Sequence, residues 1–142
     1  MAIRRLVLDR IGLFDERLFY SCEELDLSYR LLAADFRILF DPNTKITHYR
    51  AVNGGGYTEI YFDARNRPWV ALRNLPILYC ISHCFIWWGR SFLMGVRQGM
   101  VGEALRGIRD CLLGIPALCR ERRPIGRSTC RLLAHNNGRL WY

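Results

Sequence analysis

Three carboxylates lie close together in one short stretch of the chain, Glu23-Glu24-Leu25-Asp26. Carboxyl groups this close raise one another's pKa, and a carboxylate with a raised pKa can accept a proton near neutral pH. Glu24 is therefore a candidate general base. The same spacing also fits a structural role, because acidic side chains stabilise the first turn of a helix and Asp26 can pair with Arg30 one turn further on.

Other side chains could bind a metal ion or a phosphate. His48 lies in a predicted strand, where a histidine is either a metal ligand or a hydrogen-bonded core residue. Arg65 and Asn66 lie on a predicted helix after three glycines, and an arginine there either holds a phosphate or stays on a solvated face. The chain has no Gly-x-Gly-x-x-Gly, Walker, His-Glu-x-x-His or Gly-x-Ser-x-Gly motif.

The sequence around these residues predicts both helices and strands. The predicted elements are a strand or loop over 1–14, a helix over 23–36, strands over 37–40 and 45–49, and a helix over 57–74. Ser21 and Glu24 have the spacing of a capping box at the start of the first helix, and Pro68 predicts a kink or break in the second. This mixture predicts an α/β fold for residues 1–74.

The composition changes at Leu75. Residues 75–89 are almost wholly apolar, and Trp87-Trp88 near their end suit the headgroup boundary of a membrane. A helix of this length spans roughly 22 Å, whereas the hydrocarbon core of a bilayer is about 30 Å thick. Residues 91–113 mix apolar and arginine positions at helical spacing, which predicts an interfacial amphipathic helix. The alternative is a buried helical hairpin in a soluble protein.

Charge is unevenly distributed along the chain. The 142 residues carry a formal net charge of +8, and the excess lies in the arginines of residues 90–142. This asymmetry predicts an anionic partner such as lipid headgroups, nucleic acid or a phosphorylated substrate. No short motif identifies a nucleic-acid-binding module. Six cysteines without a leading apolar stretch predict reduced thiols.

Taken in order, these features resemble the C-terminal half of the family 2 glycosyltransferases, most of all the rhamnosyltransferase type. The matching stretches are Arg4-Arg5, Ile11 to Phe19, Glu23 to Arg30, Phe36 to Pro42, His48, and Tyr61 to Arg67. The resemblance implies a partial GT-A fold, its acceptor-side portion, over residues 1–74. We expect membrane-associated apolar and amphipathic helices over 75–119 and an arginine-rich tail over 120–142.

The resemblance also implies an activity. It is the inverting transfer of a sugar from a nucleotide sugar to a cell-envelope saccharide or a lipid-linked acceptor, with Mg²⁺ or Mn²⁺ on the donor diphosphate. Glu24 stands where the family has its catalytic base, usually an aspartate. Asp26, Asp15 and Glu16 match acceptor-binding positions, and His48 matches a position that contacts the metal in some members.

The family binds its nucleotide through an N-terminal half with an Asp-x-Asp motif, and this sequence contains no Asp-x-Asp. We therefore expect a missing N-terminal half or another chain as a partner, and a place at the cytoplasmic face of the cell membrane. Two other functions fit the sequence. One is a non-enzymatic membrane-surface or interaction protein derived from the same fold. The other is a basic nucleic-acid-binding module.

Overall fold

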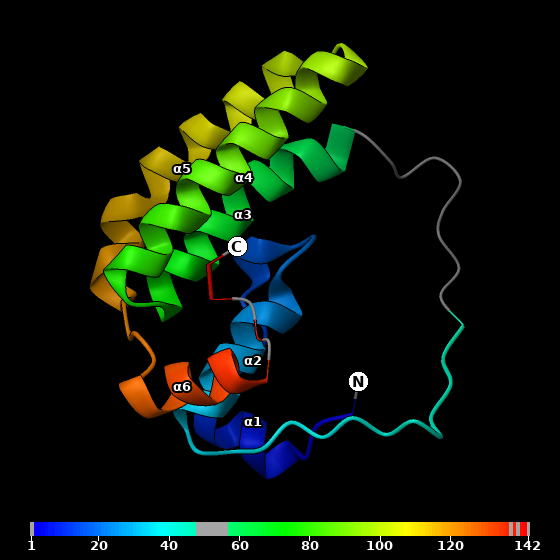
Figure 1. The fold of residues 1–142 in the computed structure, drawn as a ribbon, viewed down its shortest axis with the longest axis vertical. Coiled ribbons are helices and arrows are strands. Elements are labelled where there is room, and N and C mark those ends of the chain that lie inside the picture. The colour runs from blue at the N-terminus through cyan, green and yellow to red at the C-terminus, as the bar shows by residue number, and fades with distance from the viewer. Residues whose placement is uncertain (1, 48–56, 137, 139, 142) are drawn as a thin grey trace.

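The computed structural model describes residues 2–47, 57–136, 138 and 140–141, and its regular structure is helical throughout (Figure 1). Three long helices lie side by side, and the shorter helices gather near one end of them. In chain order the elements are α1 (Arg5–Ile11), the 3-10 helix η1 (Glu16–Leu18), α2 (Glu23–Ala33), α3 (Tyr57–Asn74), α4 (Ile77–Gln98), α5 (Val101–Glu121) and α6 (Arg127–His135).

The predicted α/β class and the partial GT-A fold over residues 1–74 are wrong for this structure, because the described residues contain no strand. Part of the expected strand or loop over 1–14 is instead helix α1. Residues 37–47 carry the first predicted strand and part of the second, but they have no neighbouring strand to pair with. A strand exists only where a second strand satisfies its backbone groups.

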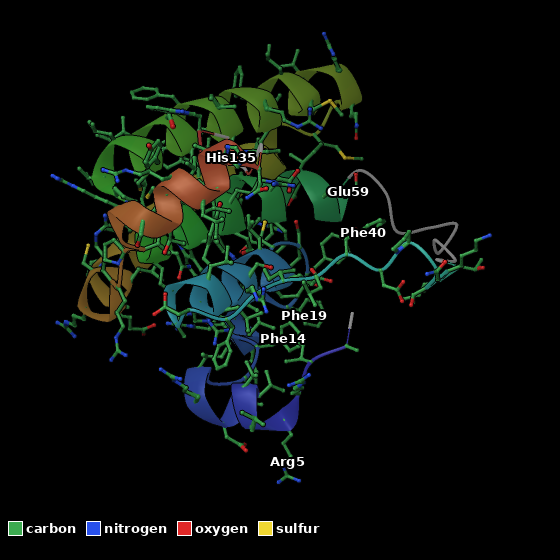
Figure 2. All side chains as sticks on the ribbon, turned by 60° about the horizontal axis from the view of Figure 1, so that its bottom comes forward. Arg5, Phe14, Phe19, Phe40, Glu59 and His135 are labelled. Atoms are coloured by element: carbon green, nitrogen blue, oxygen red, sulfur yellow. The ribbon has the colours of Figure 1, made fainter. Side chains whose placement is uncertain are left out.

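The segment of residues 37–47 keeps its apolar side chains in solvent. It loops out from the helices in Figure 1, and Figure 2 shows Phe40 on it, outside the packed helices. Leu39 and Phe40 are 83% and 90% exposed. A local pattern that favours a strand is thus present, but the partner that would bury it is not among the described residues.

Helix α2 begins at Glu23 as predicted, but its C-terminal end and its N-terminal cap differ from the prediction. It ends at Ala33 rather than at residue 36, just before Asp35, which has a positive φ of 60°. The expected capping box does not form. The helix begins after Cys22, whose φ is 74° and whose side chain makes no capping bond, while the Ser21 hydroxyl donates to Asp63.

Helix α3 confirms the predicted helix over residues 57–74 and packs against both α4 and α5. Pro68 lies inside it and is fully buried, so the proline is accommodated without ending the helix. The approach of α5 depends on Gly107, where an added Cβ would lie 2.5 Å from the Tyr61 carbonyl oxygen and 2.8 Å from the Ala64 Cβ. This glycine lowers helix propensity but permits close packing of the two helices.

The C-terminal part forms three helices. The break predicted between an apolar segment over 75–89 and an amphipathic helix over 91–113 is wrong, because α4 continues to Gln98 and the division from α5 lies at Gly99, which has a φ of 69°. Among the described residues, no helix combines the length and apolar character needed to cross a membrane. The expected arginine-rich tail contains helix α6, whose Cys130 and Leu133 pack against the core.

The end of the chain folds back onto α4. The buried His83 ring donates from Nε2 to the Leu140 carbonyl over 3.1 Å, and the Ser82 hydroxyl donates to the Trp141 carbonyl over 2.8 Å. The rings of Tyr79 and Trp141 meet edge to face with their centroids 4.5 Å apart. Burial lowers the pKa of His83, so the ring is neutral in the folded protein near pH 7.

A pair of substitutions tests this division between packed helices and exposed segment. Leu75 is completely buried in the main core, so Leu75→Ala is expected to lower the free energy of unfolding by about 2–5 kcal/mol. Phe40→Ser is expected to change it by less than about 0.5 kcal/mol, because the ring contacts solvent. Urea denaturation followed by circular dichroism measures both. A loss above about 1 kcal/mol for Phe40→Ser would contradict the exposed placement.

Candidate functional site

Arg65 and Asn66 of α3 hold the loop of residues 17–21 in place. Asn66 is fully buried, and its Nδ2 donates to the carbonyls of Leu18 and Tyr20, both over 2.7 Å. Arg65 donates to the Arg17 carbonyl over 2.6 Å, and its guanidinium lies over several aromatic rings of α3. Because these donors point at backbone carbonyls, the structure gives both residues a structural role rather than phosphate binding.

Asp26 is the most tightly bound of the predicted site carboxylates. It is 1% exposed, and one oxygen accepts from Asn74 Nδ2 over 2.7 Å. The other oxygen accepts from Arg30 Nε over 2.8 Å, and Arg73 Nη1 lies 3.6 Å from the first. Both oxygens are therefore occupied within the protein. In this structure Asp26 fixes α2 against α3.

Asp15 belongs to the same network. Its carboxylate binds Arg73 Nη1 over 2.7 Å, so Arg73 lies between the two aspartates. Hydrogen bonds from the Arg17 side chain lower the pKa of Asp15, and the charge of Arg73 adds to the effect. Arg17 continues the chain of contacts to Glu121 of α5 over 2.9 and 2.6 Å.

Glu16 and Glu24 remain on the surface. Glu16 begins η1 and is exposed, and Glu24 is exposed in the first turn of α2. Asp26 follows Glu24 by two residues and points into the protein, so the structure does not bring their carboxylates to one site. Among the predicted site residues that the structure describes, it joins only Asp15 and Asp26 in one ion-pair network, through Arg73, which the sequence did not single out.

Glu23 is the carboxylate that sequence reasoning underrated. Burial raises its pKa, and the neighbouring Glu24 carboxylate raises it further. One buried oxygen of Glu23 has no hydrogen-bond partner among the described residues. A carboxyl group in this state is suited to exchange a proton. The three carboxylates were visible in the sequence, but their different burial depends on how α2 packs.

The described residues do not provide a metal site. His48, the predicted metal ligand, lies outside the described residues. Among the residues that are described, no three His, Cys, Asp or Glu side chains are grouped so that they could hold a metal ion. The divalent cation that the resemblance implies has no ligand set here, and we derive no reaction step through it.

No protein-family model matches the chain, and no curated protein or solved structure matches it either. The similarity to family 2 glycosyltransferases therefore remains a prediction.

The contrast between Asp26 and Glu24 gives a stability test. Asp26→Ala leaves the Arg30 and Asn74 donors without their buried acceptor and is expected to lower the free energy of unfolding by about 3–5 kcal/mol. Glu24→Gln removes an exposed helix N-terminal charge and is expected to change it by less than about 1 kcal/mol. Chemical denaturation compares the two. Equal effects would show that Asp26 is not the anchor of this network.

Proposed function

We propose that this chain works at a membrane surface as the acceptor-side part of an inverting glycosyltransferase. The observation that carries the proposal is an exposed apolar face on α4. Its members are separated by helical spacing, and each is between 43% and 75% exposed: Leu78, Ile81, Phe85, Phe92, Leu93 and Val96. We call these six residues the α4 apolar face. Contiguous exposed faces of this kind are typical of contact with a membrane or another protein.

Positive charge beside this face favours a lipid surface with anionic headgroups. Arg90 and Arg97 are exposed on the same helix. Guanidinium groups next to an apolar helix face bind phosphate headgroups while the apolar side chains enter the acyl boundary. This arrangement suits a lipid-linked acceptor, because the chain and the acceptor would then share one surface.

The sequence predicted the tryptophan pair at a headgroup boundary, but the structure packs both rings against α3. Trp87 is 7% exposed, and the Arg67 guanidinium lies 3.6 Å from its ring centroid. Trp88 donates its indole N–H to the Ala64 carbonyl over 3.0 Å. Both rings thus pack α4 against α3, which fixes the outward direction of the α4 apolar face. They are not part of that face.

In the proposed reaction an acceptor hydroxyl attacks the anomeric carbon of a nucleotide sugar, the nucleoside diphosphate leaves, and a carboxylate of α2 takes the hydroxyl proton. Glu24 is open to an incoming acceptor, and Glu23 beside it has the raised pKa. The donor-binding half is a further segment or another chain. The exposed apolar side chains of residues 37–47 offer a contact surface for it.

Vesicle binding tests the membrane part of the proposal. The wild-type chain is expected to bind phosphatidylglycerol vesicles, and Leu78→Ser/Phe85→Ser to bind at least about tenfold more weakly, because each lost side chain contributes roughly 1.5–3 kcal/mol. Leu39→Ser/Phe40→Ser is the matched control, since it removes the same two side-chain types, which are even more exposed there, from another segment. Co-sedimentation measures the bound fraction. No binding by wild type, or equal losses in both variants, would contradict the role of α4.

Turnover tests the catalytic part. The chain is added to membrane extract from cells that lack its gene, with nucleotide sugars and a lipid-linked acceptor. Glu24→Gln is expected to lower the added turnover by about 10²–10⁴-fold, and Glu59→Gln, an exposed carboxylate at the start of α3, to leave it unchanged.

Glu23→Gln is the second variant in this assay. A loss confined to Glu23→Gln would move the proton-accepting role to Glu23. No added turnover from a folded wild-type chain would leave the non-enzymatic membrane-surface function in place of the glycosyltransferase.

A further inference from the structure

The C-terminal ends of four helices meet around one open cleft of about 520 Å³. Ile11 ends α1, Ala33 ends α2, Asn74 ends α3, and Glu121 ends α5, and all four line the cleft. Among the described residues that line it, Glu121 is the only carboxylate. Its lining arginines are Arg10, Arg30, Arg73, Arg120 and Arg123.

The partial negative charge at the ends of α1, α2 and α3 is already compensated. Arg30 donates to the carbonyls of Ile11 and Leu13 over 2.7 and 2.8 Å, which caps α1. Arg122 donates to the carbonyls of Leu72 and Leu75 at the end of α3. Backbone N–H groups of residues 34–36 bond the last carbonyls of α2. The remaining lining arginines are thus not needed to cap α1, α2 or α3.

The carboxylates near the cleft are also neutralised. Glu121 is bound by Arg17, and Asp15 is bound by Arg17 and Arg73. Asp26 is bound by Arg30, with Arg73 nearby. Each of these three carboxylates is therefore already paired with Arg17, Arg30 or Arg73.

Three guanidinium groups remain. Arg120 and Arg123 are exposed and have no side-chain ion pair or hydrogen bond among the described residues, and Arg10 lies over the Phe36 ring at 5.4 Å without a carboxylate partner. Like charges that surround one hollow repel one another, and an anion between them removes that repulsion. Guanidinium groups bind phosphate oxygens through two parallel N–H donors.

We propose that this cleft binds an anion with two linked phosphates, a diphosphate group. Three unpaired arginines from α1 and from the α5 end line this one cleft, and its volume of about 520 Å³ has room for two phosphates. A diphosphate can belong to a free molecule or to a lipid whose headgroup enters from the membrane. The inference depends on the cleft alone and stands apart from glycosyl transfer.

Calorimetric titration of the full chain with inorganic pyrophosphate, at ionic strength held constant with sodium chloride, tests the site. Arg120→Gln/Arg123→Gln is expected to weaken binding by about tenfold or more. The control Arg127→Gln/Arg131→Gln removes the same charge from exposed positions of α6, outside the cleft, and is expected to weaken binding less than about twofold. Circular dichroism verifies that both variants fold.

A second experiment, vesicle binding, distinguishes a free diphosphate from a lipid headgroup as the ligand. Phosphatidylcholine vesicles with and without a polyprenyl diphosphate are compared for binding of wild type and Arg120→Gln/Arg123→Gln. Pyrophosphate binding that depends on these arginines supports a site for free diphosphates, and arginine-dependent binding to the diphosphate vesicles alone supports a lipid headgroup site. Equal affinities of the cleft and control variants, or no binding in either arm, would overturn the proposal. Arg120→Lys/Arg123→Lys, which keeps the charge, is expected to bind between wild type and the glutamine variant.

Discussion

The buried carboxylate of Asp26 is the contact on which the arrangement of helices depends. It binds Asn74 over 2.7 Å and Arg30 over 2.8 Å, so it joins α2 to the end of α3. A buried charge is tolerated only when its partners satisfy it, and here each partner has a second task. Arg30 caps α1, and Arg73, which lies 3.6 Å from Asp26, also binds Asp15. One carboxylate thereby fixes three helices and the loop between α1 and α2.

The same junction determines the charge of this end of the protein. Four helices point their C-terminal ends toward it, and basic side chains are the groups that stabilise such ends. Arg30 and Arg122 do so by direct hydrogen bonds to carbonyls, whereas Arg120 and Arg123 make no such bond. Of the arginines in the C-terminal third, Arg122 thus has a structural role, whereas Arg120 and Arg123 are open to an anion.

Local signals in the sequence predicted the helices that have an apolar pattern of their own, but not the contacts between them. The pairing of Asp26 with Arg30 follows from their spacing of four residues, and the structure contains it. Its contact with Asn74 spans 48 residues and has no local signal. The predicted strand over 37–40 is wrong for the same reason. The sequence around Phe40 favours a strand, but no second strand among the described residues pairs with it. His48 lies outside them.

Helix geometry also separates the two carboxylates that the sequence placed in one motif. Residues two positions apart on an α-helix point about 200° from each other, so Glu24 and Asp26 cannot both face one acceptor while both belong to α2. Asp26 takes the inward direction because Asn74 and Arg30 are there to bind it. Any proton transfer at this helix therefore belongs to the solvent side, at Glu24 or its half-buried neighbour Glu23. Asp26 contributes by holding the helix that carries them.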